Sequence, residues 1–110
     1  MKASAAWMML LSAGALDVLW ALSMKFAQGY TRPGWTALSL VALAAFVWLL
    51  GRALSVLPVG SAYAVWTGLG AAGTALLGAV CFGEALTMGR IAGIVLIVGG
   101  VIVLRAATPA

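Results

Sequence analysis

The sequence contains no histidine, a single cysteine and only two acidic residues. One cysteine, Cys81, cannot form an internal disulfide, and without histidine no group of residues has metal-ligand spacing. The chain also offers no paired acids, no phosphate-binding loop and no activated serine or cysteine, so nothing in it supports enzymatic chemistry. We therefore expect no enzyme activity, no metal and no cofactor, and Cys81 is expected to be a small packing residue.

Charge of either sign is scarce as well. Charged residues make up 7% of the chain and hydrophobic residues 65%, whereas an ordinary soluble domain is about a quarter charged. A helix needs about 20 mainly apolar residues to cross the roughly 30 Å hydrocarbon core, so there is room for four crossings and little else. We predict an all-α membrane protein with one four-helix transmembrane domain over residues 1–110. The expected spans are about 4–24, 34–51, 58–82 and 87–104.

The six basic residues are spread singly along the chain and give it a net charge of +4. Placed near span ends, they are typical of membrane-interface anchors, and we expect a lipid bilayer and no nucleic acid as partner. If the spans alternate, three basic residues lie on each side, and the positive-inside rule gives no preferred orientation. The two groups are Lys2, Arg52 and Arg105 on one side and Lys25, Arg32 and Arg90 on the other.

Equal charge on the two sides predicts insertion in both orientations and an antiparallel, dual-topology homodimer. The alternative is a bias of one charge, hidden by errors in the span bounds. Four spans are also too few to enclose a substrate cavity comfortably, whereas two copies supply eight. Gly93 and Gly100 lie seven residues apart on one stripe of the last span and are the expected dimer seam, because small residues let helices approach closely in lipid. Glycine is, however, common in membrane helices.

Asp17 is a carboxylate inside the first predicted span. It lies 13 residues after Ser4, or about 20 Å along a helix, well within the hydrocarbon core. Insertion of an ionised Asp there costs about 2.5 to 3.5 kcal/mol, and such residues face a cavity, a partner or an ion path. The other acid, Glu84, and all six basic residues are expected at span ends. The partner of Asp17 must then come from outside, as a proton or a cationic substrate.

A single carboxylate that binds either a proton or a cation makes the two affinities mutually exclusive, which is the basis of a proton-coupled exporter. The coupling ion would be H⁺ and the partner a small cationic substrate. The alternative is that a protonated Asp17 hydrogen-bonds a neighbouring helix as assembly glue, although such contacts contribute only about 0.6 kcal/mol on average.

Aromatic and small residues accompany this acid. At 3.6 residues per turn, Gly14 and Trp20 share a face with Asp17. Tyr63 and Trp66 project from one side of the third span, where two aromatic rings can box a cation. Plain aromatic packing is the alternative for both pairs.

The paired glycines Gly68 and Gly70 interrupt the apolar third span. Paired glycines permit a kink, and a glycine-interrupted segment is typical of the moving part of a transporter. We predict a hinge at these two residues.

Several sequence features occur together over nearly the whole chain. They are Asp17 seven residues before MKFAQGYTR, the segment LPVGSAYAVWTGLG, the turn FGEALT, and Gly93 with Gly100. In this combination the chain resembles the small multidrug resistance transporters, bacterial inner-membrane proteins of similar length with four spans. The resemblance implies an antiparallel, dual-topology dimer that exports cations against protons. It also implies the pocket residues around the acid: Gly14, Trp20, Tyr63 and Trp66.

The segment DVLWA resembles the guanidinium-exporter branch of this family, which carries a Trp three residues after its acid. That branch implies guanidinium or substituted guanidiniums as substrates. Two residues depart from the family pattern: Asp17 stands where the family nearly always has Glu, and Phe46 where this branch typically has Ser. The departures leave open a broader exporter of quaternary ammonium compounds. They also leave open a non-transporting membrane assembly or accessory subunit, or one that needs a paralogue.

Overall fold

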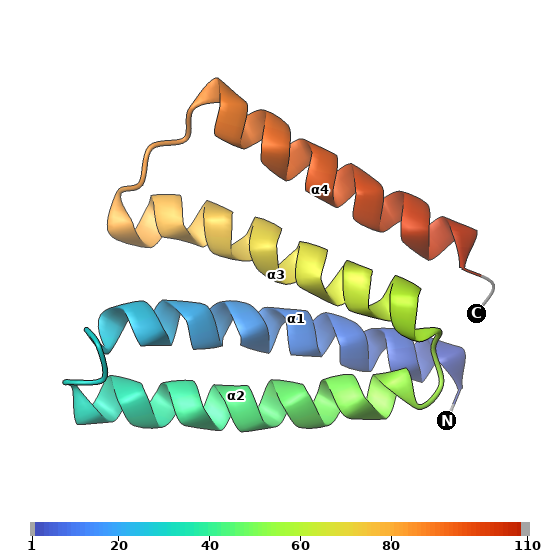
Figure 1. Ribbon diagram of the computed structural model, residues 1–110, viewed down its shortest axis with the longest axis horizontal. Helices are drawn as coiled ribbons and strands as arrows, with labels where there is room; N and C mark the ends of the chain where they lie inside the picture. The colour runs from blue at the N-terminus through green and yellow to red at the C-terminus, as the bar shows by residue number, and fades with distance from the viewer. Residues whose placement is uncertain (1, 109–110) are drawn as a thin grey trace.

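The computed structural model describes residues 2–108, which form four helices joined by short loops (Figure 1). All four are long and apolar enough to cross a membrane. They are α1 (Ala3–Phe26), α2 (Pro33–Leu54), α3 (Val59–Phe82) and α4 (Met88–Ala107). The predicted all-helical fold with four spans is therefore confirmed, and each helix begins and ends within three residues of the expected span.

The helix ends follow local chemistry. Pro33 lies in the first turn of α2 and Pro58 directly precedes α3, where a missing N–H costs nothing because those donors have no partner inside the helix. Gly83 ends α3 with φ of 65°, a left-handed conformation that glycine adopts without strain. The Thr87 hydroxyl caps α4 by accepting a hydrogen bond of 3.2 Å from the backbone N–H of Arg90. These residues set sharp turns at the membrane ends.

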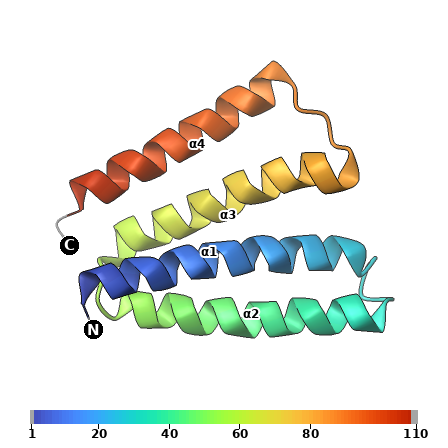
Figure 2. The ribbon, with the colours of Figure 1, turned by 180° about the vertical axis from the view of Figure 1, so that it is seen from behind.

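The helices lie side by side in an open slab of 43 × 34 × 16 Å (Figures 1 and 2). Helix α1 packs against both α2 and α3, while α4 packs mainly against α3 and also reaches α1, where the Arg105 guanidinium lies 4.5 Å from the centroid of the Trp7 ring. No residue of α4 is buried. One chain thus leaves most of α4 uncovered.

The core lies where the first half of α1 meets the end of α2 and the beginning of α3. Leu10 and Val65 are its largest fully buried side chains, and Trp7 and Leu57 close it at the loop end. Alanines occupy the remaining core positions, which lets the helix backbones approach closely. This closely packed end of the molecule lies one to two turns before Asp17. It holds α1 against α3 and fixes the register between the two helices.

Candidate functional site

Asp17 lies on the side of α1 that faces α3, and its side chain is partly buried. Its carboxylate occupies the space left by the missing side chain of Gly70, because a methyl group added there would overlap Oδ2 of Asp17. Nearby, Leu69 Cβ lies 3.4 Å from where a methyl group on Gly14 would be, and Val18 Cγ2 lies 2.8 Å from one on Gly73. We call this contact the α1–α3 seam. The acid is therefore accommodated by glycine at the seam.

The Asp17 carboxylate has no partner within the described chain. Between residues 2 and 108, its side chain forms no hydrogen bond and no ion pair. The ion pair recorded in this range joins Arg90 and Glu84, at the far end of α3. A carboxylate in this position is available to bind a proton or a cation.

Four aromatic rings from three helices contact one another in a line, which we call the aromatic row. Their centroids lie 5.4 Å apart for Trp20 and Phe46, 5.5 Å for Phe46 and Trp66, and 5.3 Å for Trp66 and Tyr63. Phe46 is 4% exposed and Tyr63 is 52% exposed. The row is thus buried at Phe46, partly buried at the two tryptophans and exposed at Tyr63.

Along the helix axes, Asp17 lies between Trp20 and Trp66 of the row. Trp20 follows Asp17 by about one turn on α1, and Trp66 precedes Gly70 by about one turn on α3. The seam contacts advance together along both helices, so α1 and α3 run parallel. Tyr63 and Trp66 are thus in direct ring contact, and Trp20 is linked to Trp66 through Phe46. Gly14 lies one turn before the acid on the seam.

The position of Phe46 in the middle of the row is the feature that sequence analysis missed. The sequence indicates only an apolar ring in place of a polar residue, whereas the structure places it between Trp20 and Trp66. Within the described residues, the buried Nε1 of Trp66 has no hydrogen-bond partner. Phe46 therefore packs hydrocarbon against the ring of a tryptophan whose buried N–H is unpaired in this part of the chain.

The predicted hinge residues lie within an unbroken helix. Helix α3 is continuous through Gly68 and Gly70, and each glycine allows a close contact. Gly70 accommodates Asp17 on one side, and a methyl group on Gly68 would lie 2.7 Å from Val101 of α4 on the other. Close packing is their visible role in this conformation, and the hinge stays a prediction.

The predicted dimer seam is uncovered in the single chain. Nothing lies within 4 Å of a methyl group added at Gly93 or Gly100. Val95 and Leu96, between them on α4, are 63% and 75% exposed. The predicted seam is therefore free to contact another chain.

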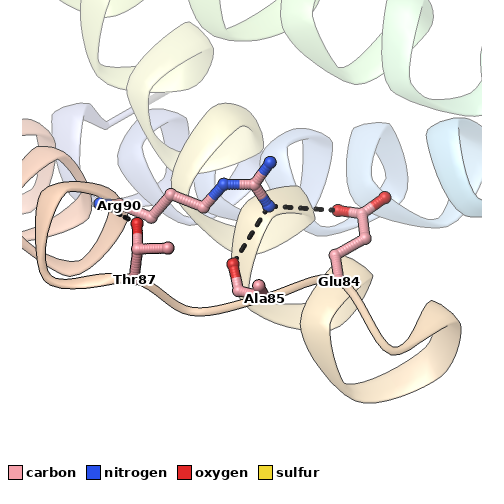
Figure 3. A network of polar contacts seen from close by, with 4 residues as sticks. All are labelled: Glu84, Ala85, Thr87 and Arg90. Atoms are coloured by element: carbon pink, nitrogen blue, oxygen red, sulfur yellow. Dashed lines mark hydrogen bonds and ion pairs between the residues drawn. The ribbon is translucent and has the colours of Figure 1, made fainter.

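The loop between α3 and α4 holds the second acid (Figure 3). Arg90 Nη1 lies 4.0 Å from Oε1 of Glu84 and donates a hydrogen bond of 3.2 Å to the carbonyl of Ala85. The Glu84 side chain folds back onto α3, so that its Oε1 lies 2.6 Å from where a methyl group on Gly78 would be. In the described part of the chain, no group of three or more His, Cys, Asp or Glu residues could hold a metal ion.

Comparison with known proteins gives consistent matches. The family model of the Small Multidrug Resistance protein matches residues 5–97. A guanidinium exporter of Yersinia pseudotuberculosis serotype I (strain IP32953) is 48% identical over 103 residues, which cover 94% of this chain and 99% of the relative. A guanidinium exporter of Citrobacter freundii is 41% identical over 93% of this chain and 97% of its own length. A guanidinium exporter of Proteus vulgaris is 38% identical over 93% of this chain and 98% of its own length.

Proposed function

Because the chain belongs to the small multidrug resistance family, we propose that it exports guanidinium or substituted guanidiniums in exchange for protons. It is a multi-pass membrane transporter and not an enzyme. The bacterial relatives named as guanidinium exporters support the substrate class, since each matches more than nine-tenths of this chain. We further propose the bacterial inner membrane as its location.

The observation that carries the proposal is the unpartnered carboxylate of Asp17 at the α1–α3 seam. A proton and a cation cannot both neutralise it at once, so the binding of one releases the other. Exchange follows if the site opens to one side of the membrane at a time. A planar guanidinium with several N–H donors suits this role, because it pairs with both oxygens of a carboxylate.

The aromatic row supplies the second element of the proposed site. Trp20, Tyr63 and Trp66 present ring faces to a bound cation, and a desolvated cation–π contact is worth about 2 kcal/mol. Gly14, one turn before the acid, lets Leu69 of α3 approach α1 closely beside the site. The row also favours apolar substituents on the cation.

We propose that the working unit is an antiparallel homodimer with dual topology. The slab of a single chain is open, and α4 packs mainly on α3 and has no buried residue. Gly93 and Gly100 offer a surface that another helix can approach closely. A second copy would cover α4 and bring a second Asp17 to the assembly.

A second substrate class is favoured by one observation, the place of Phe46 in the aromatic row. A ring there offers no hydrogen bond to a guanidinium but adds apolar surface for a quaternary ammonium ion. Exchange of both cation types by reconstituted protein separates these two candidates.

The variant Asp17→Asn tests the shared carboxylate. It keeps the shape of the side chain and removes its charge, so we expect a folded dimer that loses both substrate binding and substrate-induced proton release. Asp17→Glu is the matched control, since it keeps a carboxylate, and should retain both. Intact exchange by Asp17→Asn would refute the proposed mechanism. Loss of the dimer would instead assign Asp17 to assembly.

A further inference from the structure

Beyond Asp17, the α1–α3 seam opens into a cavity of about 160 Å³. Ala21 and Lys25 line it on the α1 side and Thr74 and Gly78 on the α3 side, and Glu84 borders it from the loop that follows α3. One water molecule occupies roughly 30 Å³ of liquid, so the cavity has room for several. Leu22 and Phe82 complete the lining, and three of the seven lining residues, Lys25, Thr74 and Glu84, carry the polar side chains that a hydrated cavity requires.

The inner part of this cavity lies close to the proposed binding carboxylate. Ala21 is four residues after Asp17 on α1, and Thr74 is four residues after Gly70, which accommodates the carboxylate. Four residues correspond to about 6 Å along a helix. The lining on both helices therefore begins about one turn from the acid.

The outer part is bordered by a second carboxylate. Glu84 lies against Gly78, four residues beyond Thr74, and its side chain is 45% exposed. Its ion pair with Arg90 spans 4.0 Å, so the carboxylate also remains open to solvent (Figure 3). Glu84 thus borders the cavity and contacts the aqueous side at the same time.

Between the two carboxylates, Thr74 contributes a hydroxyl to the cavity. Four of the eight Ser and Thr hydroxyls within the helices donate to a carbonyl three or four residues earlier, as those of Ser23 and Thr36 do. Within residues 2–108 the Thr74 hydroxyl has no such bond. It is free to donate and to accept.

Resting on the proposed proton exchange at Asp17, we propose that this cavity is the proton route in each chain between Asp17 and the face of the membrane at which the loop between α3 and α4 of that chain lies. Glu84 is its outer proton-exchanging group and Thr74 a relay. A proton on Glu84 passes to Thr74 Oγ1 or to water in the cavity, and that group passes a proton on to Asp17. Each transfer breaks one O–H bond and forms another. Glu84 ends as a carboxylate and Asp17 as a neutral acid.

The charges that face Glu84 make the route selective. Lys25 lines the same cavity, Arg90 pairs with Glu84, and Arg32 lies with Lys25 in the neighbouring pocket. Positive charge therefore exceeds negative charge at this end, which disfavours the entry of an organic cation. A proton differs from an organic cation in that it is carried as an O–H bond of Glu84 and needs no room for a separate ion. Substrate and proton then reach Asp17 by different paths.

The route is tested by the rate of proton-driven exchange in proteoliposomes that carry Glu84→Gln or Thr74→Val. We expect each variant to slow the exchange by about tenfold or more, since positioned acid–base groups contribute about 10²- to 10⁴-fold to proton transfer. Guanidinium affinity at equilibrium, and the number of protons released per cation bound, should not change, because both are set at Asp17. Glu84→Asp keeps an exchangeable acid and should restore the rate.

Wild-type rates in both Glu84→Gln and Thr74→Val would overturn the route while leaving exchange at Asp17 intact. Equal losses of exchange rate in Glu84→Asp and Glu84→Gln would also overturn the route, because Glu84 would then have a purely structural role. A change in guanidinium affinity would overturn the route for the same reason. Failure of the proposed function has a separate signature, which is unchanged binding and proton release in Asp17→Asn.

Discussion

Replacement of Gly70 by alanine tests how the binding carboxylate is held. The added methyl group overlaps Oδ2 of Asp17, so either the carboxylate must turn away or α1 and α3 must separate. Inserting a methyl group into a packed contact costs about 1 to 3 kcal/mol. If this cost falls on the position of the carboxylate, we expect guanidinium affinity to fall by about 5- to 150-fold, since 1.4 kcal/mol corresponds to a factor of ten.

The matched control is Gly73→Ala, three residues further along the same helix. Its methyl group would lie 2.8 Å from Cγ2 of Val18, so it strains the same seam without touching the acid. Gly51→Ala, which has nothing within 4 Å of the new methyl group, controls for the change of residue type alone. We expect Gly73→Ala to lower thermal stability but to keep guanidinium affinity, and Gly51→Ala to change neither.

The assay is calorimetric titration of guanidinium into detergent-solubilised protein, together with proton release measured in a weakly buffered solution. A lowered affinity in Gly70→Ala but not in Gly73→Ala would support a direct contact between position 70 and the carboxylate. Wild-type affinity in Gly70→Ala would refute the reasoning. So would equal losses in the two seam variants, because the effect would then come from helix separation.

Two further variants address substrate choice and assembly. In Phe46→Ser, a hydroxyl replaces the ring between Trp20 and Trp66. We expect the ratio of guanidinium affinity to tetraalkylammonium affinity to rise by about tenfold, which is the effect of one hydrogen bond to a charged group. An unchanged ratio of the two affinities would contradict this role for Phe46. In Gly100→Leu, the new side chain meets nothing within 4 Å of its Cβ inside the chain. We therefore expect an intact helical fold but a weakened dimer, measured by sedimentation or cross-linking. An unaffected dimer would exclude this seam.

The four spans were predictable because each is an apolar run bounded by Pro, Gly or charged residues. Asp17 was identifiable for a similar reason, since a carboxylate within such a run is costly wherever the helix lies. Both inferences need only the local sequence. The helices of the structure, such as Val59–Phe82 for α3, accordingly lie close to the expected spans.

The contacts between helices were not predictable in the same way. The contact of Asp17 with Gly70 depends on the register of α1 against α3, which is set by the packing around Leu10 and Val65 one to two turns away. The place of Phe46 depends on the register of α2. Many registers satisfy the same apolar pattern, because the slab interior and the lipid are similarly apolar. Packing against small residues selects among them.

An even number of crossings has a consequence for engineering. The first residue of α1 and the last residue of α4 lie at the same end of the slab (Figure 1). Two copies joined directly, tail to head, by a short linker would therefore be forced into the same orientation. A single polypeptide carrying one copy of each orientation would need an additional membrane crossing between the two halves.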